Sequence, residues 1–310
     1  MSILRQGCIS GLSFMSPFDR MVGIEIEVED FGYDDPTPID WGSEEDGSLR
    51  GGREFITDPT LMSDVPRIVD NFYDEFYRNR WTSSARTSTH VHVDMRDFNL
   101  EELRTSLVVY SLLEPAMMQH VGVLREANIY CVPWYRASSD VDIIAAYINS
   151  GAAHRTSMLY ETCKYSALYL EPLRRFGTIE FRHAPTYLSG DTLKQWVNIC
   201  HDVATSGIRF NLSQVIDIAD NSGINALVDV VTGGKLEGMK APSEAFDVFY
   251  VAELLLPKEY KQGSSSAAWI PNLEVSEIVP DLIGDALRQS QEEEVAGEYY
   301  DEYEIDEELE

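Results

Sequence analysis

The sequence predicts an α+β protein with an antiparallel sheet, helices packed on one face of that sheet, and a polar second face. Three segments alternate apolar and charged side chains with a period of two residues, which is typical of a strand with one buried face. Another segment repeats apolar residues at helical spacing. Because antiparallel sheets commonly bury one face under helices and leave the other open, these observations together predict this architecture.

The three alternating segments place charged and imidazole groups on one face of the predicted sheet. They span residues 21–29, 89–95 and 177–183. Apolar residues fill the other alternate positions, so those positions should face the helices. The polar positions are Glu25, Glu27 and Glu29 in the first segment, His90, His92 and Asp94 in the second, and Glu180 and Arg182 in the third.

Local signals predict the remaining elements. The stretch Gly32–Gly52 is rich in Gly, Pro, Asp and Ser, which predicts a long loop, and a short strand is expected at Arg53–Ile56. Asn99 and Glu102 form a capping-box pattern, and Pro115 is expected to kink or split the helix that they begin. Helices are predicted at 64–78, over the apolar face of the sheet, at 99–126, at 139–148, from Ser189 or Asp191 to about Ala204, and over most of 211–259, with a linker at 261–268.

Length and composition allow one large domain or two small ones. The chain has 310 residues, of which 44% are hydrophobic, and this is enough to bury a sizeable core. We expect an irregular lead-in at residues 1–20, a core region at 21–210, a mainly helical continuation of the same domain at 211–290, and an acidic, disordered tail at 291–310.

Charge and cysteine content narrow the functional class. The formal charge is −29, the wrong sign for a protein that grips the phosphate backbone of nucleic acid. The tail at 291–310 carries eleven acidic residues and no Lys or Arg, so it either stays solvated or docks on a basic partner. The four cysteines are widely spaced, and neither a signal-peptide pattern nor a long apolar run is present. We therefore expect a cytoplasmic protein with reduced thiols and no membrane association.

The polar face carries a concentration of carboxylates that needs an explanation. Glu25, Glu27 and Glu29 follow one another at about 7 Å with no cation between them. Such like charges repel one another unless positive charge lies nearby. A divalent cation such as magnesium or manganese is the simplest source of that charge. The alternative is a solvated edge strand whose glutamates point into water.

The other two polar segments each allow two interpretations. His90 and His92 present two imidazoles on one strand face, a spacing found in metal sites and also in ordinary strands. Glu180 and Arg182 lie side by side, either as an internal ion pair or as a metal ligand beside a phosphate clamp. The sequence contains no P-loop, Rossmann fingerprint, HExxH motif or GxSxG elbow. If the protein binds ATP, it must therefore do so without any of these motifs.

These blocks, in this order, resemble the family of putative amidoligases, relatives of glutamine synthetase and glutamate–cysteine ligase in the carboxylate–amine ligase superfamily. The resemblance covers residues 21–210. It implies an antiparallel sheet curved into a funnel with helices behind it, as in the catalytic domain of glutamine synthetase. The matching blocks are Gly23–Glu27, Asp46–Ser48 followed by Glu54, Thr89–Val93, and Gly177–Arg182.

The resemblance also implies a reaction and a role for each site residue. ATP would phosphorylate a substrate carboxylate, and an amine would then attack the acyl phosphate to give an amide. Arg182 would stabilise the phosphoryl group in transfer, and Asp46 would accept a proton from the amine. His92 is either a further metal ligand or orients His90. The implied ligands of magnesium or manganese are Glu25, Glu27, Glu54, His90 and Glu180.

Basic residues before the third polar segment differ from the family pattern. The family carries an Arg and an Asn shortly before the Glu-x-Arg strand, where this chain has Lys164 and Tyr169. Lys164 keeps the positive charge for ATP but lacks the bidentate fork of arginine. Arg155, Arg174 and Arg175 either bind phosphate or a substrate carboxylate, or form surface ion pairs.

Three functions from different classes remain open at this point. The leading hypothesis is an ATP-dependent ligase that acts on a protein, a peptidoglycan precursor or a small amine. A non-catalytic binding protein that kept the ligase fold would not bind nucleotide with magnesium. A metal-dependent hydrolase built on His90, His92 and the glutamates would work without ATP and favour zinc.

Overall fold

The computed structural model describes residues 20–32, 35–47, 49–122, 125, 128–150, 165–239, 246–257 and 260. All of them belong to one compact unit that spans residues 1–269. The predicted linker and acidic tail lie outside the described residues, as does the predicted lead-in apart from Arg20.

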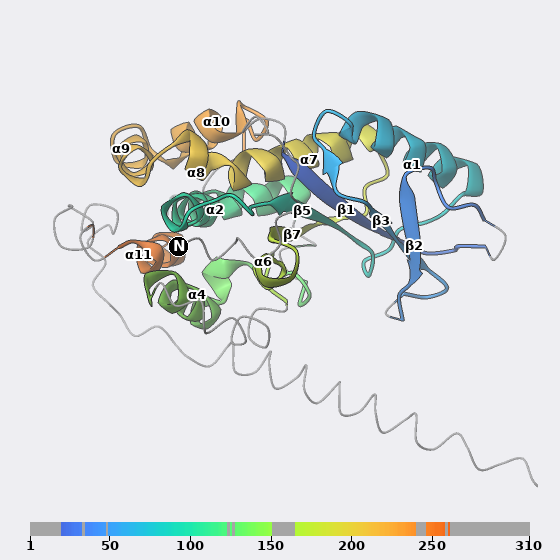
Figure 1. Ribbon diagram of the computed structural model, residues 1–310, viewed down its shortest axis with the longest axis horizontal. Coiled ribbons are helices and arrows are strands. Elements are labelled where there is room, and N and C mark those ends of the chain that lie inside the picture. Colours follow the sequence, from blue (N-terminus) through green and yellow to red (C-terminus); the bar gives the residue numbers. More distant parts are fainter. Residues whose placement is uncertain are drawn as a thin grey trace, which may run out of the picture. The chain divides into compact units, whose positions relative to one another are not determined.

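A seven-stranded antiparallel sheet forms the centre of this unit, which confirms the α+β class (Figure 1). The strand order is β2-β3-β1-β5-β7-β6, and β4 pairs with β1 outside this path. The strands are β1 (Met21–Val28), β2 (Trp41–Glu45), β3 (Arg53–Thr57), β4 (Thr60–Leu61), β5 (Ser88–Asp94), β6 (Leu168–Tyr169) and β7 (Thr178–Pro185).

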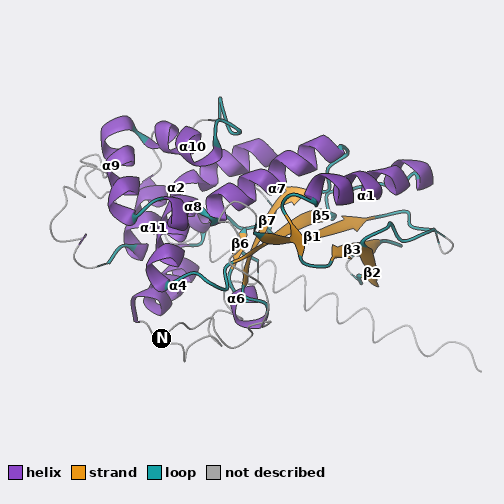
Figure 2. Cartoon of the chain, turned by 45° about the horizontal axis from the view of Figure 1, so that its top comes forward, coloured by secondary structure: helices purple, strands orange, loops and turns teal. Residues whose placement is uncertain are grey.

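Helices α1, α2 and α7 cover one face of the sheet, as both ribbon views show (Figures 1 and 2). Helices α8, α9, α10 and α11 pack against α2, α4 packs against α11, and α6 packs against β7. The helices are α1 (Val65–Asn79), α2 (Leu100–Val121), the 3₁₀ helix η1 (Trp134–Arg136), α4 (Ser138–Ser150), α6 (Pro172–Arg175), α7 (Gly190–Ala204), α8 (Ser206–Arg209), α9 (Leu212–Ser222), α10 (Ile224–Thr232) and α11 (Phe246–Leu255).

The apolar face of the sheet forms the core, as the alternation predicts. Ile24 and Ile26 of β1 and Val91 of β5 are fully buried under the helices. Phe72 of α1 packs on Phe55 of β3, with ring centroids 5.5 Å apart. Because burial of apolar surface is the main favourable term in folding, this core holds the opposite, polar face of the sheet in place.

The predicted loop at Gly32–Gly52 is wrong over part of its length, because β2 lies inside it. Trp41 anchors this strand: its indole nitrogen donates to the carbonyl of Ile68 in α1 at 3.1 Å, and its ring packs against Phe72. One buried aromatic residue followed by mostly exposed positions creates no alternating pattern. Residues 41–45 therefore form a strand because they pair with β3, and the local sequence pattern does not predict this strand.

Helix α2 departs from the prediction in two ways. It is not split at Pro115, although a split is one of the two outcomes predicted there, and it ends at Val121, where Gly122 caps it with a φ of 98°, before the predicted end near Glu126. Every residue from Leu103 to Met118 is buried. Burial on all sides outweighs the cost of the hydrogen bond that proline cannot make, roughly 3 kcal/mol. The predicted capping box of Asn99 is confirmed.

Most other predicted elements are confirmed within two residues of their expected ends. They include α1, α4 and α7, with the apolar stripe of α7 buried. Gly233 and Gly234 adopt positive φ at the predicted turn after α10. Cys131 and Cys200 are buried free thiols. No helix among the described residues has both the length and the apolar character needed to cross a membrane.

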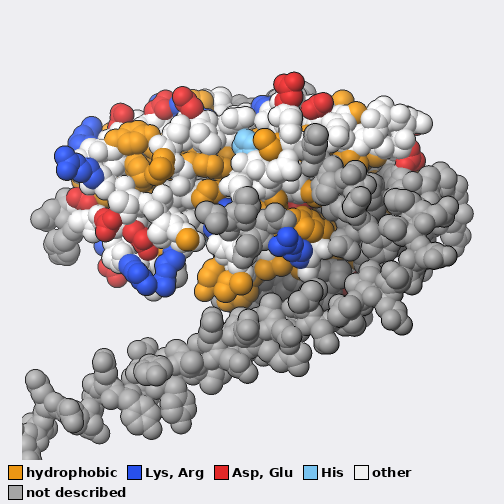
Figure 3. Space-filling model, turned by 180° about the vertical axis from the view of Figure 1, so that it is seen from behind, with side chains coloured by type: hydrophobic (Ala, Val, Ile, Leu, Met, Phe, Trp, Pro, Cys, Tyr) orange, Lys and Arg blue, Asp and Glu red, His pale blue; other side chains and the backbone are white. Residues whose placement is uncertain are grey.

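The described surface carries both signs of charge. Figure 3 shows Lys and Arg side chains and Asp and Glu side chains on one face, interspersed with apolar ones. This face therefore does not present its acidity as a single continuous patch in the part that the structure describes.

Gly207 in α8 lies in close contact with α2, one of the helices that cover the sheet. An added Cβ atom there would lie 1.8 Å from the carbonyl oxygen of Glu102. We expect Gly207→Ala to lower the free energy of unfolding by about 3 kcal/mol, because backbone atoms must move to admit the methyl group. Gly47→Ala is the control, since nothing lies within 4 Å of its added Cβ. Urea unfolding of both variants measures the difference, and equal stabilities would contradict the described contact of α8 with α2.

Candidate functional site

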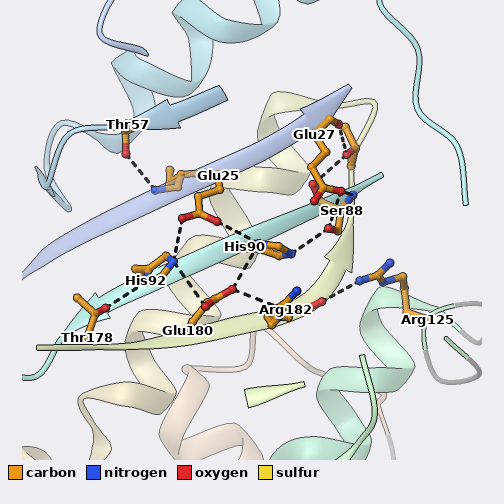
Figure 4. A network of polar contacts seen from close by, with 12 residues as sticks. Glu25, Glu27, Thr57, Ser88, His90, His92, Arg125, Thr178, Glu180 and Arg182 are labelled. Carbon is orange, nitrogen blue, oxygen red and sulfur yellow. Dashed lines mark hydrogen bonds and ion pairs between the residues drawn. The ribbon is translucent and has the colours of Figure 1, made fainter. Parts of the chain in front are cut away.

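Antiparallel pairing brings polar residues from four neighbouring strands together on one face (Figure 4). Directly opposed side chains in such a sheet lie about 5 Å apart at Cβ. The six residues predicted to bind metal therefore form one cluster, which we call the acidic cluster. Its opposed pairs are Glu27 and Glu54 between β1 and β3, Glu25 and His90 between β1 and β5, and His92 and Glu180 between β5 and β7.

Two imidazoles and two carboxylates meet at the centre of the acidic cluster (Figure 4). His90 Nδ1 lies 3.0 Å from Glu25 Oε2 and 3.4 Å from Glu180 Oε1. His92 Nε2 lies 3.1 Å from Glu25 Oε1 and 3.9 Å from Glu180 Oε2. Each carboxylate therefore faces both rings, and each ring faces both carboxylates.

Two hydroxyl groups orient the histidine rings. The Oγ1 atom of Thr178 lies 3.1 Å from His92 Nδ1, and the Oγ atom of Ser88 lies 2.9 Å from His90 Nε2. Partners of this kind fix the direction of a ligand side chain and are important in metal sites. Sequence analysis missed both residues, although each occupies a polar position of the same period-2 pattern as its neighbours in the cluster.

Ser88 also holds the carboxylate of Glu27. Its backbone nitrogen and its hydroxyl donate to Glu27 Oε2 at 2.6 and 2.8 Å. Glu27 is 7% exposed, and it lies directly opposite Glu54 on β3. One buried carboxylate therefore faces a second carboxylate, with Ser88 supplying neutral donors rather than positive charge.

The central histidines act as counter-ions in the absence of metal. Burial alone would lower the pKa values of His90 and His92, but hydrogen bonding to Glu25 and the charge of Glu180 outweigh burial and raise both. Burial alone would raise the pKa of Glu25, but hydrogen bonds from the two histidines hold it well below its usual value. The raised pKa values of both imidazoles favour their protonated forms, whose charge offsets that of the two central carboxylates.

Glu54 lacks such compensation. Its pKa is raised to about 7, first by burial and then by repulsion from Glu25, Glu27 and Asp46, which the charge of His90 opposes only in part. A carboxyl group with a pKa this high gains from any additional positive charge nearby.

Two overlapping groups of side chains could hold a cation. One consists of Glu25, His90 and Glu180, and the other of Glu27, Glu54 and His90; within each group the candidate ligand atoms lie within 4.8 Å of one another. Carboxylate oxygen is the preferred ligand of magnesium and manganese, and imidazole is accepted by manganese and zinc. The donor set and the raised pKa of Glu54 therefore fit a divalent cation.

Arg182 and Asp46 border the acidic cluster. Arg182 Nε lies 3.6 Å from Glu180 Oε1, and its guanidinium carbon lies 5.7 Å from the ring centroid of Tyr169. Asp46 follows β2 and is close enough to raise the pKa of Glu54. The structure thus brings the guanidinium group of Arg182 and the carboxylate of Asp46 to the edges of the cluster.

The other polar candidates lie elsewhere or outside the described residues. Lys164 and Arg155 are not among the residues that the structure describes. Arg174 and Arg175 of α6 both form ion pairs with the buried Glu171, at 2.6 and 2.9 Å. Two polar positions of the alternating pattern also make local contacts: Glu29 accepts from the backbone of Arg50, and Asp94 pairs with Arg96.

Comparison with known proteins adds one match. A family model described as "Putative amidoligase enzyme" matches residues 44–204, which is more than half of the chain. The matched region contains Glu54, His90, His92, Glu180 and Arg182, and it begins after β1, which carries Glu25 and Glu27. No curated protein sequence matches the chain significantly.

The raised pKa of Glu54 predicts a pH-dependent stability. Its pKa is near 4.5 in the unfolded chain and about 7 in the folded protein. The folded state therefore binds the proton more tightly, so stability falls as the pH rises through this window. We expect Glu54→Gln, in the presence of chelator, to be more stable than the wild type by on the order of 2 kcal/mol at pH 8, and the difference should shrink at pH 5.

Denaturant unfolding at the two pH values measures this effect. Glu45→Gln is a suitable control, because Glu45 lies on the neighbouring strand β2 with a side chain that is 85% exposed. A stability difference for Glu54→Gln that is the same at pH 5 and pH 8 would show that the carboxyl titrates normally in the folded protein.

Proposed function

Because the chain belongs to the putative amidoligase enzyme family, we propose that it is an ATP-dependent carboxylate–amine ligase that forms an amide through an acyl phosphate. The observation that carries this proposal is the acidic cluster, in which carboxylates and imidazoles from four strands lie beside the guanidinium of Arg182. Phosphoryl transfer needs mainly positioning and neutralisation of charge, and this arrangement supplies both.

Magnesium or manganese is the proposed partner of the acidic cluster. When bound, such a cation neutralises phosphate charge and aligns the phosphoryl group. A neutral imidazole has one free lone pair, so His90 can complete only one of the two ligand groups at a time. His92 lies against both carboxylates of the other group. The proposed sets are Glu27, Glu54 and His90 for one ion, and Glu25, Glu180 and His92 for the other.

Arg182 is proposed to bind the phosphoryl group in transfer. In the first step, an oxygen of the substrate carboxylate attacks the γ-phosphorus of ATP, and ADP leaves with the bonding electron pair. Negative charge then spreads over the transferred oxygens. The guanidinium of Arg182 has a planar fork that matches these oxygens, and its neighbour Glu180 keeps it at the edge of the acidic cluster.

Asp46 is proposed to accept a proton in the second step. The amine attacks the carbonyl carbon of the acyl phosphate, inorganic phosphate leaves with the electron pair of the carbon–oxygen bond, and the nitrogen loses a proton. Asp46 lies in the segment after β2, on the side of the cluster that holds Glu54. A carboxylate at this border can take the proton while the cluster carboxylates remain available for cations.

The proposal extends to the shape of the site and to further phosphate contacts. The antiparallel sheet, with helices on one face, is compatible with a funnel over the polar face like that of glutamine synthetase. Lys164 and Arg155 are proposed as additional cations for ATP. The proposed substrates are a carboxylate and an amine, either of which can belong to a protein or a peptide.

Calorimetric titration of ATP with and without magnesium tests this function. We expect binding only with the metal, and binding weakened by about tenfold or more in Glu27→Gln and Glu180→Gln, since even partners of metal ligands typically cost that much. Glu29→Gln is a matched control from the same run of glutamates, because Glu29 lies outside both ligand groups. ADP release on addition of acid and amine pairs would then identify the substrates.

Two results would contradict the proposed ligase function. Absence of ATP binding to the folded wild type with any divalent metal would favour the binding protein. Zinc retained through purification without chelator, together with metal-dependent hydrolysis and no nucleotide binding, would favour the hydrolase.

A further inference from the structure

A β-bulge interrupts the pairing of β5 with β7 beside the acidic cluster. The register shifts by one residue between Thr89 and Val91 of β5, so His90 alone faces two residues of β7, Arg182 and His183. Bulges increase the local twist of a sheet and change the direction of side chains, and they are common next to active sites. The position of Arg182 relative to the cluster therefore depends on the geometry of this bulge.

Arg125 binds both backbone carbonyls of the bulge. Its Nε donates to the carbonyl of His183 at 2.9 Å, and its Nη2 donates to the carbonyl of Arg182 at 2.8 Å (Figure 4). Arg125 is 6% exposed. The rigid fork of a guanidinium can span two successive carbonyls in a fixed geometry, and a lysine ammonium cannot do so.

The side chain of His183 ties the bulge to α2 on the other face of the sheet. The ring is fully buried, and its Nε2 lies 3.0 Å from the hydroxyl of Tyr110. That hydroxyl donates to Glu114, which also accepts from the backbone nitrogen of Trp134 at 2.9 Å. The second residue of the bulge is thus held by a buried hydrogen-bond network.

Arg182 itself is also held by β6 and the residues that lead to it. Its backbone nitrogen donates to the carbonyl of Ala167 at 2.8 Å, and its guanidinium lies over Tyr169 of β6. The backbone of Arg182 is therefore bound at its N–H by the segment that leads to β6 and at its C=O by Arg125. Removal of Arg125 takes away one of these two supports.

We infer that Arg125 is a positioning residue that sets the place of Arg182 in the site through the carbonyls of the bulge. This inference rests on the proposed role of Arg182 in binding phosphate. Arg125 does not border the acidic cluster with its own charge, since its guanidinium points at the backbone of β7. Its effect on a ligand must therefore pass through Arg182.

Arg104 provides a matched control for the cost of losing a buried arginine. It is also 6% exposed, and it also donates to a backbone carbonyl, that of Ile148, at 3.3 Å. It lies in α2, pairs with Glu101 of the same helix and bonds to Ile148 of α4. A merely structural role for Arg125 would give Arg125→Met and Arg104→Met similar consequences.

A double-mutant cycle with manganese and ATP tests the inference. We expect Arg125→Met to weaken binding of the manganese–ATP complex by about tenfold, as loss of outer-shell partners typically does, and Arg125→Lys to weaken it less. In a background of Arg182→Gln, Arg125→Met should have no further effect, because coupled residues are not additive. Arg104→Met should bind like the wild type. If the losses of affinity caused by the Arg125 and Arg182 substitutions multiply in the double variant, the inference is wrong. The proposed ligase function would not be affected by that result.

Hydrogen exchange of the ligand-free protein separates this inference from the proposed function. Amides in residues 178–185 should exchange faster in Arg125→Met and Arg125→Lys than in the wild type, and Arg104→Met should leave them unchanged. If the wild type binds no manganese–ATP, the proposed function fails, and this exchange pattern alone decides the inference. Unchanged exchange in both Arg125 variants overturns it, and Arg125→Lys carries both measurements if Arg125→Met does not fold.

Discussion

The packing of like charges on one face of a sheet is the constraint on which the rest of the site depends. Four glutamates, Glu25 and Glu27 of β1, Glu54 of β3 and Glu180 of β7, project onto a partly buried surface that also includes β5. The carboxylates at the centre of this surface raise the pKa values of His90 and His92 and so favour their protonated forms, whereas burial and neighbouring carboxylates raise the pKa of Glu54 to about 7. A cation that entered would displace protons from the histidines and from Glu54, so its affinity should increase with pH.

The rest of the fold compensates for the unfavourable electrostatic energy of this concentration of charge. The opposite face of the same strands is a continuous apolar core under α1, α2 and α7. The neutral hydroxyl groups of Ser88 and Thr178 fix the direction of the site side chains without adding charge. A site on paired strands is more precisely held than a site on loops. The stability of the core thus offsets the repulsion within the acidic cluster.

The sequence predicts the polar face well because its cause is local. Period-2 alternation in β1, β5 and β7 places Glu25, His90 and Glu180 on one side of the sheet whatever their exact neighbours are. Ser88 and Thr178 occupy polar positions in the same pattern, so the same reasoning could have found them.

Features that arise from pairing between distant strands could not be predicted in this way. The register that sets Glu27 opposite Glu54, and the bulge opposite His90, depend on contacts far apart in sequence. Strand β2 exists because Trp41 packs under α1 and because β3 pairs with it. Arg125 follows the end of α2, in a stretch that the sequence predicts to continue this helix, so nothing local connects it with β7.

The central claim is that the acidic cluster holds divalent cations. Anomalous diffraction from crystals soaked in manganese at pH 8 tests it most directly. We expect manganese peaks bounded by the carboxylates of Glu25 and Glu180 or by those of Glu27 and Glu54, with an imidazole of His90 or His92 as a further ligand. Crystals that show manganese only at other surface carboxylates, with the histidines still bound to Glu25, would contradict the account.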